Sequence, residues 1–424
     1  MRIVRGIVLY LSLVVAATAM FALISPVYLT IFIHSKRVIR LRRWYCDLLS
    51  SVYLDFAAAL LTSSLCGTKV YLYSNDAEVL NDRGTLMLSN HRCRVDWMYS
   101  GFCYNSALNS NGQLRFVLKS SIRGVPIFGW IMSCMMYLFV TRKDRNEDLD
   151  NMGKVTKYLL HSGGRPNIFL FPEGTDLTES SLIKAHDHAK SHNLPVMNYV
   201  LVPKVSGVER VLNELRGHGG AVHDITVAYK DYNLGGKGDI RPSEVSMWKG
   251  EFPQEVHLCV KRYEMDQLPT KRPELEKWVF NSFEHKEKLL ASYYENDSSI
   301  PTAEYIKDAT KRVDQKTSTN EEKDKKIAAM EAWPQKIPLT IKVWQPLMIV
   351  YIVWIFGVGA AAYMFSAVRW YLIIITVYSA LARAIGNGFD LIELYLHSNL
   401  TCETKSRSLS DTSIGSDDET KKKK

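Results

Sequence analysis

An apolar run near the amino terminus constrains the fold of this chain more than any other feature. Ile7 to Ile33 is a nearly uninterrupted apolar stretch, long enough to cross a bilayer as a helix. It is too long for a removable signal peptide, and no cleavage site of small residues follows it. Pro26 is expected to kink the helix or end it early. The sequence therefore predicts a membrane-anchored protein.

A second apolar region lies near the carboxyl terminus and is divided in two. Its halves, Pro346 to Phe365 and Tyr371 to Ala382, are separated by a short stretch that contains Arg369. A tight transmembrane hairpin is the simple interpretation, and a buried helical pair in a soluble domain is the alternative. A third segment, Ser51 to Tyr73, contains Asp55 and is a poor span. We expect it to lie in the membrane interface or to form a half-buried return.

The charges around the first apolar run predict an orientation. Arg2 and Arg5 precede the run. More basic residues follow it, namely Lys36, Arg37, Arg40, Arg42 and Arg43. Positive residues favour the cytoplasmic side of short flanks, so the central part of the chain is predicted to face the cytosol.

The stretch Asn90 to Asp96 carries a histidine with a carboxylate five positions later, His91 and Asp96. In a regular helix that spacing turns the second side chain roughly 140° from the first. The two can meet only if His91 lies in an irregular turn or begins a helix, which Ser89 or Asn90 would cap. A carboxylate that fixes the tautomer of a histidine makes it a general base. No nucleophilic Ser or Cys motif stands nearby, so the activated group must belong to a substrate.

Three short apolar runs downstream each end in a polar group or a turn. Tyr137 to Thr141 is followed by Arg142, and Asn167 to Phe171 leads into a Pro-Glu-Gly-Thr turn. A third run, Tyr199 to Val202, ends at Pro203. This arrangement is typical of an α/β sheet that presents a site at its strand ends.

These blocks, in this order, resemble the glycerolipid acyltransferase family, which acylates glycerol-3-phosphate and lysophospholipids from acyl-CoA. At Met136 many members have glycine instead. The residues that match the four family motifs are, in order, Asn90, His91 and Asp96; Phe139, Val140 and Arg142; Phe171 to Thr175; and Val202 with Pro203. Asn90 to Trp97, Phe171 to Glu179 and Ala221 to Tyr229 look like the lysocardiolipin branch of the family.

The resemblance implies a fold and an activity. The expected fold is α/β, a mixed sheet flanked by helices, with anchoring helices before it and a transmembrane hairpin after it. The implied reaction moves a fatty acyl group from acyl-CoA to a free hydroxyl of a lysophospholipid. His91 would remove the proton of that hydroxyl while Asp96 holds the imidazole and stabilises its cation. Acyl-CoA is thus a substrate, and no cofactor is expected.

Further residues are predicted to bind the acceptor. Arg142 can grip a phosphate bidentately, and by resemblance Asn90, Glu173, Gly174 and Thr175 shape the same site. Glu173 is expected to orient Arg142 or a sugar hydroxyl; the alternative is an Arg–Glu pair that only braces the sheet.

The identity of the acceptor has more than one candidate. The lysocardiolipin-type resemblance implies an anionic acceptor: lysophosphatidylinositol, lysocardiolipin or lysophosphatidylglycerol. Lysophosphatidic acid, used across the wider family, is the runner-up. A membrane scaffold with an inactive site is a different class of hypothesis. Intact His91, Asp96, Arg142 and Glu173 disfavour it, because nothing in folding requires all of them.

Other patterns argue against metals, nucleotides and nucleic acid. Seven scattered cysteines include no C-x-x-C pair, so neither a zinc site nor a disulfide framework is indicated. His186, His188 and His192 are interpreted as a solvated helix face. No Walker or G-x-G-x-x-G loop and no nucleic-acid-binding signature appears. The net charge of +9 fits attraction to anionic lipids and to CoA phosphates, or ordinary basic flanks.

The segment Lys119 to Trp130 mixes cations, Gly, Pro and large apolar residues. It is predicted to form either a rim where a lysophospholipid enters from the bilayer or a loop that closes the core.

The chain is divided as follows: an anchor at 1–75, an acyltransferase domain at 76–265, a charged helical region and linker at 266–342, a hairpin at 343–396, and a disordered tail at 397–424. Lys421 and Lys422 match a dilysine signal, which implies retrieval-coat partners and an endoplasmic reticulum address.

Overall fold

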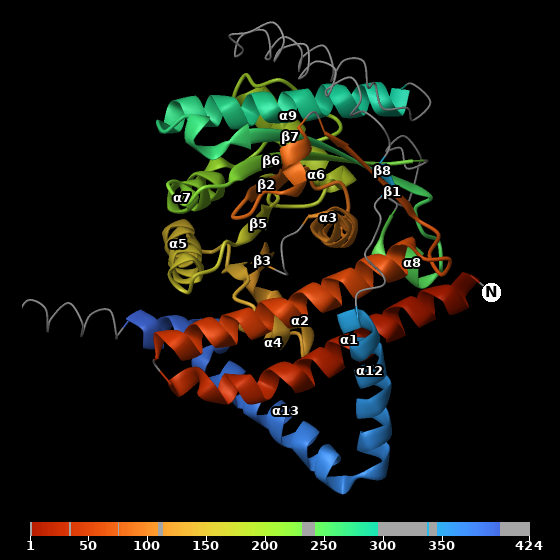
Figure 1. Ribbon diagram of the computed structural model, residues 1–424. Helices are drawn as coiled ribbons and strands as arrows, with labels where there is room; N and C mark the ends of the chain where they lie inside the picture. Colours follow the sequence, from red (N-terminus) through yellow and green to blue (C-terminus); the bar gives the residue numbers. More distant parts are fainter. Residues whose placement is uncertain are drawn as a thin grey trace, which may run out of the picture.

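The chain comprises paired amino-terminal helices, a central sheet domain and a carboxyl-terminal helical hairpin (Figure 1). The architecture agrees with the predicted α/β fold with apolar helices at both ends. The computed structural model describes residues 2–33, 35–74, 76–108, 113–230, 242–295, 337–338 and 346–398.

The sheet is mixed. In the described residues its strand order is β4-β3-β5-β2-β6-β7-β1-β8. The pairs from β4 to β6 are parallel, β6 and β7 are antiparallel, and β1 is parallel to β7 but antiparallel to β8. The bounds are β1 Lys69–Ser74, β2 Leu86–Ser89, β3 Leu114–Lys119, β4 Leu138–Val140, β5 Asn167–Leu170, β6 Ala221–Tyr229, β7 Glu255–Glu264 and β8 Ile337–Pro338.

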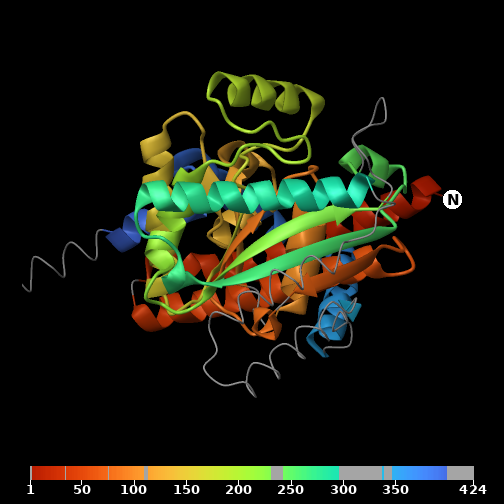
Figure 2. The same ribbon diagram turned by 90° about the horizontal axis from the view of Figure 1, so that it is seen from above.

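Side-chain alternation along the central strands builds a core on each face. Leu86 and Leu88 of β2 face one apolar cluster, whereas Met87 between them faces the other. The first face is covered by α5 (Arg145–His161), α7 (Val205–Leu215) and α9 (Arg272–Glu295). Seen from above, α9 runs alongside the long strands (Figure 2). Because helices cover both faces, β2, β5 and β6 are buried along their whole length.

The opposite face of the sheet is covered by short helices and by the amino-terminal pair. Residues Trp97–Cys103 form a π-helical turn that continues into α3 (Tyr104–Ala107), and α4 spans Phe128–Cys134. Beneath them lie α1 (Arg2–Tyr28) and α2 (Lys36–Thr62). Both amino-terminal helices are long and apolar enough to cross a membrane.

The amino-terminal predictions are partly right. Pro26 lies in the last turn of α1, which ends at Tyr28, before the end of the apolar run, and is followed by a 3-10 turn. The segment from Ser51 to Tyr73 is not one interfacial element. Its first part completes α2, and its last residues enter β1. The predicted boundary at residue 75 is therefore wrong, because β1 pairs with β7 inside the sheet.

The carboxyl-terminal pair of apolar helices is present. α12 (Pro346–Met364) and α13 (Ser366–Gly386) meet at Phe365 and project away from α1 and α2 (Figure 1). Their outer side chains are open to the surroundings, with Phe356 75% exposed and Tyr363 87% exposed. Such apolar exposure on a projecting pair fits contact with lipid. α13 is long and apolar enough to span a bilayer, and the described apolar part of α12 is shorter.

Two of the cations counted as a cytosolic flank are buried. Arg42 and Arg43 belong to α2 and are 2% and 3% exposed. The Nη2 atom of Arg42 lies 2.7 Å from Glu393, and that of Arg43 lies 3.2 Å from the same carboxylate. Glu393 is carried by a helical segment, residues 389–398, that returns to the domain after α13. These two cations therefore cannot contribute to the predicted orientation as a solvated flank.

The boundary predicted at residue 265 is also misplaced, because α9 packs on the sheet and on α7. The linker after Glu295, most of the tail, and the lysines at 421 and 422 lie outside the described residues.

Candidate functional site

The histidine motif occupies an irregular turn between β2 and the π-helical turn. β2 ends at Ser89, and helical structure begins only at Asp96. Of the two predicted settings for His91, an irregular turn and the first residue of a helix, the structure has the irregular turn. The predicted capping role of Ser89 and Asn90 is wrong, because no helix begins there.

The turn brings His91 and Asp96 together. Nδ1 of His91 lies 3.0 Å from Oδ2 of Asp96. The imidazole stacks on Phe171 with ring centroids 4.2 Å apart, so its plane is fixed from a second direction. The His91 side chain remains 19% exposed while that of Asp96 is fully buried. A carboxylate held in this way orients the imidazole and leaves Nε2 for another group.

Asp96 is surrounded by donors. Its Oδ2 accepts the backbone N–H of Cys93 at 2.9 Å. Its Oδ1 accepts the Cys93 thiol at 3.1 Å and the Tyr229 hydroxyl at 2.6 Å. Burial raises the pKa of the Cys93 thiol well above its usual range, as does the adjacent carboxylate. The thiol therefore stays protonated and is a donor rather than a nucleophile.

Asn90 has a structural role, in contrast to its predicted contact with substrate. It is fully buried, and its side chain bonds both backbone groups of Val227. Oδ1 accepts the Val227 N–H at 2.8 Å, and Nδ2 donates to the Val227 carbonyl at 3.2 Å. Because both ends of the amide are occupied, Asn90 extends the β2–β6 pairing past the end of β2.

Glu173 also differs from its predicted role. Its carboxylate is buried and accepts the backbone N–H of His91 at 2.9 Å and that of Leu201 at 3.1 Å. Desolvation raises the pKa of Glu173 well above its usual range, while the two backbone donors oppose that shift. Glu173 thus braces the turn that carries the histidine, and the predicted pairing with Arg142 is not among the contacts of the described residues.

Arg142 follows β4 and takes a left-handed backbone conformation, with φ of 62°. Its backbone N–H donates to Asp148 at 2.7 Å, which fixes that conformation. Its exposed side chain lines the same cavity as His91. Gly174 also lines the cavity at φ of 77°, whereas Thr175 contacts Asp176 outside the lining.

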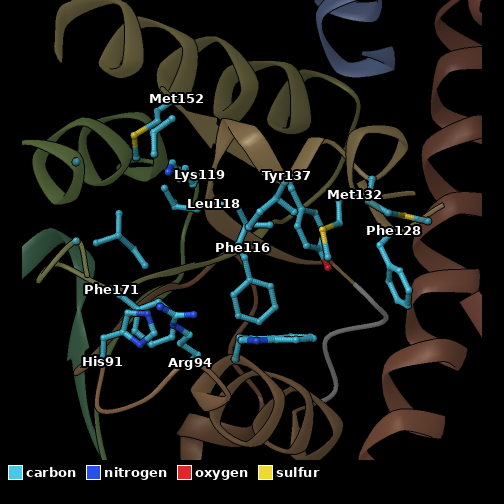
Figure 3. A pocket seen from close by; sticks show the side chains of 18 of the residues that line it. His91, Arg94, Phe116, Leu118, Lys119, Phe128, Met132, Tyr137, Met152 and Phe171 are labelled. Carbon is cyan, nitrogen blue, oxygen red and sulfur yellow. The ribbon is translucent and has the colours of Figure 1, made fainter. Parts of the chain in front are cut away.

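The cavity beside His91 has a volume of about 1080 Å³. His91, Arg94 and Phe171 lie at one end, and Phe128 and Met132 lie at the other, beside the amino-terminal helix (Figure 3). Its wall near α1 is apolar and includes Leu13 and Met20. Cations on the wall are Arg94, Lys119, Arg142, Lys143, Arg145 and Lys204. The cavity can therefore hold an amphipathic molecule with an anionic group.

The predicted strand Tyr199 to Val202 is wrong. These residues have no ladder partner, because their N–H groups are bonded to carboxylates instead. Glu287 of α9 accepts from Asn198, Tyr199 and Val200, and Glu173 accepts from Leu201. The neighbour of β2 on that side is β6.

The segment from Lys119 to Trp130 lines the cavity through Lys119, Ile122 and Phe128. This placement fits the predicted rim, and entry of lipid through it stays a prediction. His186 and His188 lie on α6 (Glu179–Ser191) and His192 at its end. Among the described residues no His, Cys, Asp and Glu group is arranged to hold a metal ion.

Comparison with known proteins shows the family to which the chain belongs. A family model described as "Acyltransferase" matches residues 72–228, and one described as "Acyltransferase C-terminus" matches residues 246–330. The chain is 33% identical to lysocardiolipin acyltransferase 1 of Mus musculus over 83% of this chain and 85% of that protein. The chain belongs to the glycerolipid acyltransferase family.

Other relatives extend the comparison. Lysophosphatidylinositol acyltransferase 10 of Caenorhabditis elegans is 28% identical over 66% of this chain and 70% of that protein. A crystal structure of the 1-acyl-sn-glycerophosphate acyltransferase PlsC from Thermotoga maritima covers 68% of this chain and 98% of its own. It is 19% identical, with a TM-score of 0.41.

Several residues at the site were not predicted from the sequence, and Tyr229 and Lys204 are two of them. Tyr229 ends the Ala221 to Tyr229 stretch, and its position at a strand end was the available signal. Lys204 directly follows the Val202–Pro203 motif, and its side chain approaches Gly174.

Proposed function

We propose that this protein transfers a fatty acyl group from acyl-CoA to a free glycerol hydroxyl of an anionic lysophospholipid. The observation that carries the proposal is His91, oriented by buried Asp96 at one edge of a cavity with both apolar and cationic walls. The family membership supports acyl transfer to a glycerolipid as the reaction class.

The proposed chemistry is direct transfer. Nε2 of His91 removes the proton of the acceptor hydroxyl as its oxygen attacks the thioester carbonyl. The bond from carbonyl carbon to sulfur breaks, and the thiolate of CoA leaves and takes up the proton. Asp96 stabilises the imidazolium that forms between these steps. No acyl-enzyme is needed, since the nearby Cys93 thiol is buried and donates to Asp96.

An anionic acceptor is supported by the cavity wall. Arg142 and the other lining cations can meet a phosphate, and the apolar wall near α1 can meet an acyl chain. Relatives named for lysocardiolipin and lysophosphatidylinositol support acceptors of this kind. Lysophosphatidylglycerol completes the proposed set.

The test is incorporation of labelled oleoyl-CoA into a panel of lysolipids by washed membranes that contain the full chain. We expect label in one or more of lysophosphatidylinositol, lysocardiolipin and lysophosphatidylglycerol, and none with His91→Ala at matched membrane abundance. Preference for lysophosphatidic acid would favour synthesis of phosphatidic acid instead. No incorporation into any lysolipid would favour a membrane scaffold, and a near-normal His91→Ala variant would refute the mechanism.

We further propose the endoplasmic reticulum membrane as the location, with the catalytic domain in the cytosol. The apolar helices support membrane association, and Lys421 and Lys422 match a dilysine retrieval signal. The sequons at Asn296 and Asn399 provide the check, since both should remain unglycosylated. A mobility shift with endoglycosidase that depends on either asparagine would refute this topology.

A further inference from the structure

The donors to Asp96 come from two different places in the chain. Cys93 lies within the same turn as His91, so its contacts with Asp96 form locally. Tyr229 lies 133 residues away, at the end of β6. Its hydroxyl makes the shortest of the contacts to Oδ1, at 2.6 Å. That length is typical of a charge-assisted O–H···O⁻ bond, which is about twice as strong as a neutral one.

The end of β6 holds the motif turn at two points. Val227 clamps the side chain of Asn90 at the start of the turn, and Tyr229 holds Asp96 at its end. Val227 uses its backbone groups to bond Asn90, whereas Tyr229 uses its side-chain hydroxyl to bond Asp96. The two contacts therefore do not compete for the same atoms. Within the turn the backbone of His91 is held by Glu173 and by the N–H of Leu177, and the two ties to β6 fix the ends of the turn.

Tyr229 is itself fixed from other elements. Its backbone N–H donates to the hydroxyl of Tyr294 in α9 at 3.0 Å. Tyr99 of the π-helical turn meets its ring edge-on with centroids 6.1 Å apart. Burial, together with the Asp96 carboxylate, raises the pKa of the Tyr229 hydroxyl well above its usual range. The phenol therefore remains a proton donor throughout the pH range in which an imidazole titrates.

We propose that Tyr229 is a positioning residue for acyl transfer, whose hydroxyl fixes the Asp96 carboxylate and limits the negative charge presented to His91. This inference rests on the proposed role of His91 as the general base. A donor on Oδ1 draws charge away from Oδ2, the oxygen that contacts the imidazole. Loss of the donor leaves more negative charge on Oδ2 and strengthens its attraction for an imidazolium.

The test is the pH profile of kcat/KM for Tyr229→Phe, measured on the full chain in washed membranes. We expect kcat to fall on the order of tenfold, the scale of one hydrogen bond to a charged group, with both KM values unchanged. The acidic limb of the profile should move to higher pH. A merely structural role would lower the amount of active enzyme but would not move this limb.

Tyr104→Phe is the matched control. Tyr104 is also fully buried, and its hydroxyl bonds Nδ1 of His223 at 2.9 Å, away from the cavity lining. Replacement of Tyr229 by 3-fluorotyrosine, a more acidic phenol, gives a second variant that keeps the ring and hydroxyl. A stronger donor should move the acidic limb downward, opposite to Tyr229→Phe. The remaining ionisable groups around His91 are common to all variants, namely Asp96, Cys93, Glu173, Arg94, Arg142 and Lys204.

Opposite shifts in the two Tyr229 variants, with none in Tyr104→Phe, would support the proposal. An unmoved limb in both Tyr229 variants, or an equal shift in Tyr104→Phe, would overturn it. If Tyr229→Phe fails to fold, the fluorotyrosine shift alone decides. An inactive His91→Ala beside an unshifted Tyr229 profile defeats this inference alone, whereas an active His91→Ala defeats the proposed function as well.

Discussion

Replacing Glu393 should loosen the attachment of the carboxyl-terminal segment to the domain. Its Oε1 accepts from Nε of Arg42 at 3.2 Å and from Nη2 of the same residue at 2.7 Å. Its Oε2 accepts from Arg43 and from the Tyr28 hydroxyl, each at 3.2 Å. Tyr158 of α5 also donates to Oε1. One carboxylate thus links residues 389–398 to α1, α2 and α5.

The expected magnitude follows from burial. Glu393 is 3% exposed, and its two arginine partners are as buried. Glu393→Gln keeps the shape but removes the charge, which leaves two guanidinium groups buried with no counterion on this side chain. Breaking a buried ion pair by removing one partner costs about 3–5 kcal/mol. An exposed ion pair contributes about 0–1 kcal/mol, so the contrast is measurable.

The assay is thermal unfolding in detergent combined with limited proteolysis after residue 386. Glu276→Gln is the control, because Glu276 forms an exposed pair with Arg272 at 3.0 Å within α9. We expect a clear loss of stability and faster cleavage for Glu393→Gln and near-wild-type behaviour for Glu276→Gln. Equal effects of the two variants would refute the conclusion that this cluster holds the segment in place.

The other predictions concern the site and pH. Gly174→Ala should lower activity several-fold without loss of membrane binding, because φ is 77° and a Cβ there would lie 3.3 Å from Nζ of Lys204; kinetics in washed membranes check it. Arg142→Lys should raise the acceptor KM about tenfold and leave that of acyl-CoA unchanged, since lysine cannot bind a phosphate bidentately; the reverse pattern would place Arg142 on the CoA side. Burial lowers the pKa of His223, so the unfolded chain binds a proton at this residue more readily than the folded chain does. The free energy of unfolding should therefore fall as pH drops below about 6.5. His223→Gln should flatten the dependence of Tm on pH in that range, and an unchanged slope would contradict the assignment.

Local features of the site could be predicted from the sequence. His91 and Asp96 lie in one short turn, so their meeting requires only that the turn be irregular, and the spacing already demanded this. β4 and β5 follow from short apolar runs, because strands buried on both faces have no polar alternation. The apolar helices were visible because bilayer-length runs are rare in soluble domains.

Long-range pairing could not be predicted from the same patterns. Arg42 and Glu393 are 351 residues apart, and in the sequence both look like ordinary surface charges. Glu393 reaches Arg42 because residues 389–398 return to the domain after α13. Composition counts charges but does not reveal which are neutralised inside. For this reason a count of basic residues after the first helix overstated the solvated positive flank.

The run from Tyr199 to Val202, which does not form the predicted strand, explains the role of Glu173. An apolar run predicts a strand only if a neighbouring chain is free to bond its N–H groups. Here Glu287 and Glu173 accept those groups instead, so the run is fixed in place without entering the sheet. The same Glu173 carboxylate accepts the backbone N–H of His91, which links the histidine turn to this run. Glu173 is buried and is not among the residues that line the cavity, so its carboxylate holds the turn rather than a substrate hydroxyl. The acidic residue of the Pro-Glu-Gly-Thr turn therefore fixes the position of His91, while Arg142 and Gly174 line the cavity.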